Sequence, residues 1–321
     1  MVLLLAPLHA LAMIRAMTFR RALWLGLKIT GALFLLLIIL VASVWIYFHP
    51  GFTRTNDLVY GHRHGEELTI DIVKPTSPNG LGVLLMVSGG WKSGRGSVRP
   101  WMIAPLLRRG YTVFAVYHIS QPKATVMEIN DDVHRATRFV RHHAKEYGVD
   151  PNRLGVTGGS AGGHLSLMLA TRDEPLPADQ QTDAIDRESS AVQAVAIFYP
   201  VTDLLNLGDS TENLHDGGPP KSFVKGFGPN STNLAVWKVI GTDLSPIFHI
   251  HSNLPPTLIY HGDADTLVPL DQSQRYQAEA RKLGNTVELV VHRKGNHGWL
   301  SMLWDIRHFA QWFDKYLKPA N

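Results

Sequence analysis

The sequence predicts an α/β protein with a mostly parallel central sheet, helices on both faces of that sheet and one membrane-spanning helix before it. Two observations carry this prediction. Short apolar runs typical of strands alternate with helix-like segments over most of the chain. A long uncharged apolar run stands near the start. With 45% hydrophobic and 18% charged residues, the 321-residue chain is typical of a globular protein with a substantial core.

Composition and charge exclude several classes of function. The chain has no cysteine, which excludes disulfides and thiolate metal sites. The formal net charge is +4, and residues 1–50 contain basic residues but no acidic one. These basic residues are Arg15, Arg20, Arg21 and Lys28. The rest of the chain is therefore neutral overall, and we expect no nucleic-acid partner.

The apolar run over residues 29–48 predicts a membrane-spanning helix. It carries no charge, and as a helix it spans about 30 Å, the thickness of a bilayer's hydrocarbon core. Trp45 and Tyr47 stand near its end, where aromatic rings favour the headgroup zone. We expect an uncleaved signal-anchor. The alternatives are a cleaved signal peptide, whose apolar region is normally shorter and whose cleavage site is not evident near Ala42, and a buried core helix, which would show a polar face.

The charge that precedes this helix predicts its orientation. A basic lead over residues 1–28 favours a cytoplasmic N-terminus and a body on the periplasmic or extracytoplasmic side of the membrane. Met17 opens a second basic segment and is an alternative start to Met1. A linker over 49–54 is expected to join the helix to one folded domain over 55–321.

The folded domain is expected to open with paired strands at 57–60 and 67–73, followed by a wholly apolar strand at 83–87 that is covered on both faces. Further strands are expected at 112–117, 192–198, 257–260 and 286–291, and another strand is expected directly before Ser160. Helices are expected at 101–109, 126–147, 270–283 and 302–317. Residues 172–190 and 206–233 break the alternation, either as lids over a site or as plain surface loops.

The stretch around Ser160 predicts a nucleophile. Residues 156–164 read Val-Thr-Gly-Gly-Ser-Ala-Gly-Gly-His, a Gly-x-Ser-x-Gly motif between an apolar strand and a helix-like run. A serine on such a sharp turn adopts a strained backbone, and Gly158 and Gly162 leave the room it needs. The turn exposes the hydroxyl and aims the first amides of the next helix at the same point. The alternative is a tight turn without chemistry.

Two further residues are placed to work with this serine. A serine hydroxyl needs an imidazole to take its proton and a carboxylate to hold that imidazole. Asp265 and His297 each follow an expected strand, in the order Ser160, Asp265, His297. We therefore expect these three residues to form a catalytic triad. Asp263 competes with Asp265 for the acid role, and His261 is expected to pack within its own loop.

Backbone amides for a substrate oxyanion are expected from two places. Gly89 and Gly90 follow the strand at 83–87, where a glycine run lets bare N–H groups approach a substrate. The amide of Ala161 completes the expected oxyanion hole. Trp91 either lines the substrate pocket or packs.

Together these motifs resemble the α/β-hydrolase superfamily, in the esterase and lipase branch related to hormone-sensitive lipase and to bacterial feruloyl and acetyl esterases. The resemblance covers roughly residues 55 to 318. The stretches that carry it are Gly89-Gly90-Trp91, Asp150-Pro151-Asn152-Arg153, Gly158-Gly159-Ser160-Ala161-Gly162-Gly163, Ser245-Pro246-Ile247, His261-Gly262-Asp263-Ala264-Asp265, Val268-Pro269 and His297-Gly298. It implies an α/β-hydrolase fold, Asp265 as the acid, and hydrolysis of a carboxylic ester through an acyl-Ser160 intermediate with no metal or organic cofactor.

The chain departs from the family pattern at one point. The family usually has His-Gly-Gly-Gly-Trp in the oxyanion loop, whereas Val87 and Ser88 stand at the positions of the histidine and the first glycine. That histidine normally braces the loop.

Three functional hypotheses follow. The first is a membrane-anchored serine ester hydrolase whose partners are a small-molecule ester and the lipid bilayer. The second is a peptidase of the prolyl-oligopeptidase type, although such enzymes usually carry a large propeller before the hydrolase domain. The third is a catalytically silent member that binds a partner or lipid. The sequence indicates neither the acyl and alcohol groups of a substrate nor the oligomeric state.

Overall fold

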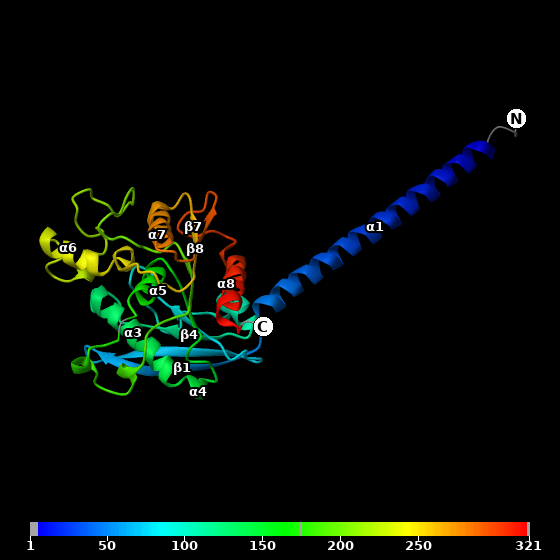
Figure 1. Cartoon of the computed structure of the whole chain (residues 1–321). Helices are drawn as coiled ribbons and strands as arrows, with labels where there is room; N and C mark the ends of the chain where they lie inside the picture. The colour runs from blue at the N-terminus through cyan, green and yellow to red at the C-terminus, as the bar shows by residue number, and fades with distance from the viewer. Residues whose placement is uncertain (1–5, 174, 320–321) are drawn as a thin grey trace. The chain divides into compact units, whose positions relative to one another are not determined.

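The computed structural model describes residues 6–173 and 175–319, with side chains from residue 21 onward. The chain divides into two compact units, one up to His49 and one from Pro50 (Figure 1). We describe each unit by itself. The basic lead predicted over residues 1–28 lies partly outside the described residues, because residues 1–5 are not described.

The first unit is a single helix, α1 (Ala6–Phe48). Its part from Arg21 to Phe48 contains an 18-residue stretch with a mean hydropathy of 2.7. By length and composition this is the one helix among the described residues that can cross a membrane. The predicted apolar run over 29–48 lies inside it, and the helix ends just before Pro50.

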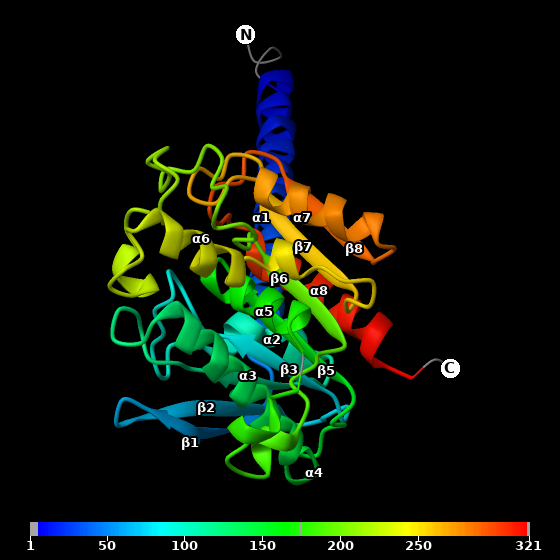
Figure 2. The same ribbon diagram turned by 60° about the vertical axis from the view of Figure 1, so that its left-hand side comes forward.

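The second unit is built on one eight-stranded sheet (Figure 2). Its strands are β1 (Phe52–Arg63), β2 (Glu66–Pro75), β3 (Gly82–Met86), β4 (Thr112–Val116), β5 (Leu154–Gly159), β6 (Ala194–Phe198), β7 (Thr257–Gly262) and β8 (Val287–His292). The order across the sheet is β1-β2-β4-β3-β5-β6-β7-β8. β2 pairs antiparallel with both β1 and β4, and the remaining neighbours are parallel. The predicted mostly parallel sheet is confirmed.

The register of the parallel strands brings their carboxyl ends to one edge. Gly159 at the end of β5 pairs with Phe198 at the end of β6, and Phe198 pairs with Tyr260 of β7. Gly262 at the end of β7 pairs with His292 at the end of β8. The loops that follow β5, β7 and β8 therefore start at the same edge, where ligands bind in open α/β sheets.

Helices cover both faces of the sheet, as predicted. The α-helices of this unit are α2 (Ala104–Arg108), α3 (Val126–His142), α4 (Ala144–Tyr147), α5 (Ala161–Thr171), α6 (Leu234–Asp243), α7 (Asp271–Lys282) and α8 (Met302–Leu317). Successive side chains of a strand point to opposite faces. Phe114 and Val116 of β4 join a core with α3, α5 and α7, while Val113 and Ala115 join a second core with α2 and α8.

The first strand is longer than predicted. β1 begins at Phe52, which pairs with Pro75, and it therefore takes up part of the linker expected over 49–54. The extra residues were missed because those that follow Phe52 at the start of β1 are polar, so they show no apolar alternation.

The predicted helices differ from the observed ones in three places. The helix expected over 126–147 breaks at His143 into α3 and α4. The helix expected over 101–109 is a 3₁₀ turn, η1 (Pro100–Ile103), followed by the short α2. The helix α6 was not predicted; it begins where the side chain of Asn233 accepts hydrogen bonds from the N–H groups of Ala235 and Val236.

Candidate active site

Ser160 stands on the sharp turn between β5 and α5, as the motif predicts. Its φ of 56° lies in the left-handed region that side chains rarely adopt. A Cβ at Gly158 would lie 2.5 Å from the backbone of Gly162, and a Cβ at Gly162 would lie 2.4 Å from the carbonyl oxygen of Met86. Only glycine fits at these two positions, so the strained turn depends on both.

The structure brings Ser160, Asp265 and His297 together. The imidazole Nε2 of His297 lies 2.9 Å from Ser160 Oγ, and its Nδ1 lies 2.7 Å from Asp265 Oδ2. Asp265 is buried, while the ring of His297 is partly open to solvent. With the proton on Nδ1 donated to the carboxylate, Nε2 is free to accept the serine proton.

Asp265, and not Asp263, contacts the imidazole. Oδ1 of Asp265 accepts hydrogen bonds from the N–H groups of Leu267 and Val268, both at 3.0 Å, which leaves Oδ2 for His297. Asp263 is exposed, and its Oδ1 accepts a hydrogen bond from the backbone N–H of Lys294 instead. The geometry therefore favours Asp265 over Asp263, the two carboxylates that the sequence offered for the acid role.

His261 lies near the end of β7, not in a loop as expected, and it packs against the loop that follows the strand. It is fully buried, its Nδ1 lies 2.7 Å from Ser273 Oγ and its Nε2 lies 2.7 Å from the carbonyl oxygen of Val268. Burial lowers its pKa below the ordinary value. His261 thus anchors the loop that carries Asp265.

Tyr199 is a neighbour of the imidazole that the sequence did not reveal. It directly follows β6, and its ring centroid lies 4.4 Å from that of His297. Burial raises the pKa of its phenol to about 12, so the ring is neutral. Its φ of 32° lies in the left-handed region. The sequence signal that could have pointed to Tyr199 is its position directly after a strand of the sheet.

The expected oxyanion donors are partly revised. Ala161 is the first residue of α5, so its N–H has no carbonyl within the helix to bond. Gly90 has a φ of 56°, and it lines the same pocket as Ser160. The N–H of Gly89 donates to the carbonyl oxygen of Lys92 at 2.9 Å. Gly89 is therefore engaged in its own loop, which leaves Gly90 and Ala161 as candidate donors.

A histidine from the loop that follows β4 reaches the glycine loop at 88–90. His118, just after β4, is buried, and its Nε2 lies 2.9 Å from Ser88 Oγ. Its Nδ1 lies 2.9 Å from the carbonyl oxygen of Ile119 and donates to it. Burial lowers the pKa of His118 to about 4, so Nε2 accepts the hydroxyl proton of Ser88. No local motif around His118 signals this contact.

Trp91 both packs and lines the pocket. Its indole Nε1–H donates to Nδ1 of His164 on α5 at 3.2 Å, and its ring packs edge-on against Phe223 and Phe227. The other nitrogen of His164 lies 2.7 Å from the carbonyl oxygen of Leu244, and burial lowers the pKa of His164 to about 4. A neutral His164 thus fixes Trp91 against the helix that begins at Ser160.

A small pocket of about 60 Å³ adjoins Ser160. Its walls are mostly apolar, and its aliphatic lining residues are Val201, Leu204, Leu207, Pro220, Leu267 and Val268. Leu207 and Phe223 belong to the irregular segment 206–233, which therefore forms part of the pocket wall. None of the described residues that line it comes from 172–190.

No group of three or more His, Cys, Asp or Glu side chains is placed to hold a metal ion in the part of the chain that the structure describes. The groups that meet at this edge of the sheet are the hydroxyl of Ser160, the imidazole of His297 and the carboxylate of Asp265. This set is suited to acyl transfer through the serine.

Strand order, turn and side-chain arrangement are those of an α/β-hydrolase. The family model BD-FAE matches residues 70–279, well over half of the chain. The chain belongs to the BD-FAE family.

Two curated relatives come from Mycobacterium tuberculosis. A probable carboxylic ester hydrolase, LipM, is 32% identical over 244 residues, which cover 74% of this chain and 53% of LipM. The esterase LipQ is 33% identical over 239 residues, which cover 72% of this chain and 53% of LipQ. The chain thus matches about half the length of these relatives.

Solved structures of an esterase from Thermogutta terrifontis share the fold. Its esterase 2 phosphoramylated by tabun has a TM-score of 0.64 and 26% sequence identity, and the match covers 84% of this chain and 97% of that chain. The same esterase with propionate bound has a TM-score of 0.63 and 27% identity, covering 85% and 97%. With butyrate bound the TM-score is 0.61 and the identity 28%, again covering 85% and 97%.

Proposed function

We propose that the protein is a membrane-anchored serine hydrolase that cleaves carboxylic esters through an acyl-Ser160 intermediate. The observation that supports it most strongly is one imidazole, that of His297, in hydrogen-bond contact with both Ser160 Oγ and the buried carboxylate of Asp265. Such an arrangement activates an otherwise weak nucleophile.

The proposed reaction has two halves. His297 Nε2 takes the proton of Ser160 as Oγ attacks the ester carbonyl carbon, and the buried Asp265 stabilises the imidazolium that forms. The N–H groups of Gly90 and Ala161 donate to the tetrahedral oxyanion. His297 then gives the proton to the leaving alcohol, and water activated by the same imidazole releases the acid from Ser160.

For the acyl group of the substrate we propose a short chain. The apolar pocket beside Ser160 holds only about 60 Å³, and Leu207 and Phe223 close its wall. The Thermogutta terrifontis esterase, of the same fold, is described with propionate and with butyrate bound. Both acids have short acyl chains.

The names of the relatives favour an ester over a peptide. LipM, LipQ and the Thermogutta terrifontis protein are each described as an esterase or an ester hydrolase. The modified forms of the Thermogutta terrifontis esterase are phosphorus adducts, which are typical of serine hydrolases. These names support the ester hypothesis, and no comparable observation supports the peptidase alternative.

For the location we propose a single-pass anchor with the folded domain on the extracytoplasmic side. The helix over Arg21–Phe48 has the length and hydropathy for a span. Arg15, Arg20, Arg21 and Lys28 precede or open it without an acidic residue, and such segments stay in the cytoplasm.

A substrate comparison tests the activity. The detergent-solubilised protein is assayed on p-nitrophenyl esters and on a dipeptide p-nitroanilide, as the native chain, as Ser160→Ala, and as Ser252→Ala, which alters an exposed serine away from the pocket. We expect ester hydrolysis in the native chain and in Ser252→Ala only. Amide cleavage that exceeds ester cleavage would instead support the peptidase.

A further inference from the structure

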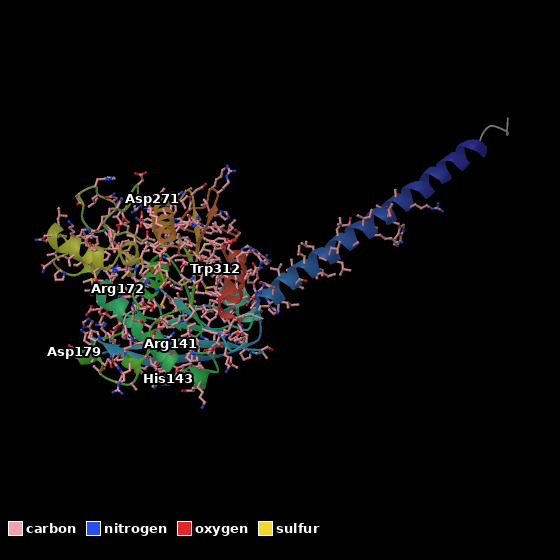
Figure 3. The ribbon with its side chains drawn as sticks, in the orientation of Figure 1. Arg141, His143, Arg172, Asp179, Asp271 and Trp312 are labelled. Carbon is pink, nitrogen blue, oxygen red and sulfur yellow. The ribbon has the colours of Figure 1, made fainter. Side chains whose placement is uncertain are left out.

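A second and larger cavity, of about 430 Å³, shares no lining residue with the pocket at Ser160. It lies between the end of β1, the helix α3 and the segment that follows α5. Arg172, labelled in Figure 3, comes from the end of α5 and lines it. Its volume is in the range of small-molecule sites.

Most of the charges that line this cavity are paired. Arg63 lies 2.7 Å from Asp132, Arg135 lies 2.6 Å from Asp186, and Arg172 lies 2.8 Å from Asp243. Arg138 differs from these three arginines. Its exposed fraction is only 4%, and it makes no hydrogen bond or ion pair with any residue that the structure describes.

A buried guanidinium without a directly bonded counter-ion is costly, because no hydrogen-bonded partner compensates its transfer from water. The buried Nε of Arg138 has no acceptor among the described residues. Burial lowers the pKa of Arg138, and Arg135 adds to this effect, while the nearby carboxylates of Asp186 and Asp131 oppose it without a direct bond to the guanidinium. A ligand with an anionic group would supply the missing partner.

Two more polar atoms on the same face of α3 are buried and unpartnered. Asn130, His134 and Arg138 recur every four residues, so they form one row along the helix. Asn130 Oδ1 and His134 Nε2 have no partner among the described residues, and both side chains line the cavity. His134 Nδ1 lies 3.0 Å from Ser190 Oγ. These three side chains therefore present unpartnered hydrogen-bonding groups to the cavity, where a polar ligand can bind them.

We propose that this cavity binds a small molecule that carries both an oxyanion and hydroxyl groups. The oxyanion, a carboxylate or a phosphate, pairs with the guanidinium of Arg138. A hydroxyl group donates to Asn130 Oδ1. Asp131 is exposed and also lines the cavity, where it accepts from a second hydroxyl.

Calorimetry on the full detergent-solubilised chain tests the ligand class with three probes. Gluconate offers a carboxylate with hydroxyl groups, glucose 6-phosphate offers a phosphate with hydroxyl groups, and sorbitol offers hydroxyl groups alone. We expect saturable binding of at least one of the two anions and none of sorbitol, and the stronger anion identifies the oxyanion. The proposal is overturned if neither anion binds, or if sorbitol binds as tightly as the anions.

Variants test the role of Arg138. Arg138→Gln removes the charge, and we expect it to weaken binding of the anion about 10- to 100-fold while leaving the unliganded melting temperature unchanged or higher. Arg99→Gln removes an exposed arginine outside the cavity and should bind as the native chain does. Unchanged affinity in Arg138→Gln overturns the proposal.

A second variant covers the case in which Arg138→Gln does not fold. His134→Glu places a carboxylate one helical turn before Arg138, where the two side chains can pair. We expect this internal counter-ion to displace the ligand and abolish binding. Binding at native affinity in His134→Glu overturns the proposal.

Discussion

The imidazole of His118 is hydrogen-bonded to the hydroxyl of Ser88, with Nε2 and Oγ 2.9 Å apart. The carbonyl oxygen of Ser88 in turn accepts the N–H of Gly162 in α5 at 3.1 Å. Ser88 therefore ties the glycine loop to the end of β4 and to the helix that begins after Ser160. In α/β-hydrolases of this kind a histidine within the loop usually braces it, whereas the histidine that contacts the loop here follows β4.

Removal of this brace should slow the reaction more than it weakens binding. In His118→Ala the loop loses its contact with β4, and the N–H of Gly90 moves relative to the oxyanion. We expect kcat for a short aryl ester to fall about tenfold to a hundredfold with KM little changed. Steady-state kinetics check this, with the exposed His142→Ala as control. Equal losses in the two variants would argue against the brace.

Substitution of the acid should distinguish the two candidate carboxylates. In Asp265→Asn the partner of His297 Nδ1 becomes an amide, which favours the wrong tautomer of the imidazole, and we expect kcat to fall about 10⁴-fold. Asp263→Asn is the matched control, because the side chain of Asp263 accepts from the backbone of Lys294 and not from His297, and it should keep activity within about tenfold. A larger loss in Asp263→Asn would reverse the assignment.

The small pocket predicts the acyl preference. With p-nitrophenyl esters of increasing chain length, kcat/KM should peak between acetyl and butyryl and fall for octanoyl. Leu207→Ala shortens a side chain of the pocket wall and should shift the peak to longer chains, because each added methylene gains about 0.8 kcal/mol when buried. A native chain that prefers octanoyl esters would show that another surface holds the acyl group.

Buried neutral histidines should make the protein sensitive to mild acid. Burial lowers the pKa of His134 to about 3 and those of His118 and His164 to about 4. Below pH 6.5 the unfolded chain binds protons that the folded chain does not, so the free energy of unfolding should fall as the pH falls towards 4. Each histidine contributes about 1.4 kcal/mol per pH unit at most.

Urea unfolding of the detergent-solubilised protein between pH 6.5 and 5 measures this dependence. His134→Gln should reduce the slope by about one proton, whereas the exposed His142→Gln should not. Identical slopes in the native chain and in His134→Gln would mean that His134 is protonated in the folded state.

Those parts of the site that rest on local chemistry could be predicted from the sequence. The turn at Ser160 needs small residues at Gly158 and Gly162, and the five-residue motif from 158 to 162 shows both glycines directly. Asp265 and His297 each follow an apolar run, and runs of that kind become parallel strands whose carboxyl ends meet. The position of Asp265 and His297 directly after strands was therefore enough to predict that they lie near Ser160.

Contacts between distant segments could not be predicted in this way. His118 meets Ser88, and Tyr199 meets His297, across pairs of segments joined only by the tertiary fold. One local contact could not be predicted either. The N–H of Gly89 donates to the carbonyl oxygen of Lys92 across a turn in which Trp91 has a left-handed backbone. The unpaired charge of Arg138 appears only once the partners of its neighbours are known.

Labelling with a fluorophosphonate tests most directly whether Ser160 is an activated nucleophile. The folded native chain is treated with the probe and digested, and the modified peptide is sequenced by mass spectrometry. We expect one adduct, on Ser160, that accompanies complete loss of ester hydrolysis and is absent from Ser160→Ala and from His297→Ala. Ester hydrolysis that persists in Ser160→Ala, or a native chain that hydrolyses esters with Ser160 unmodified, would contradict the account.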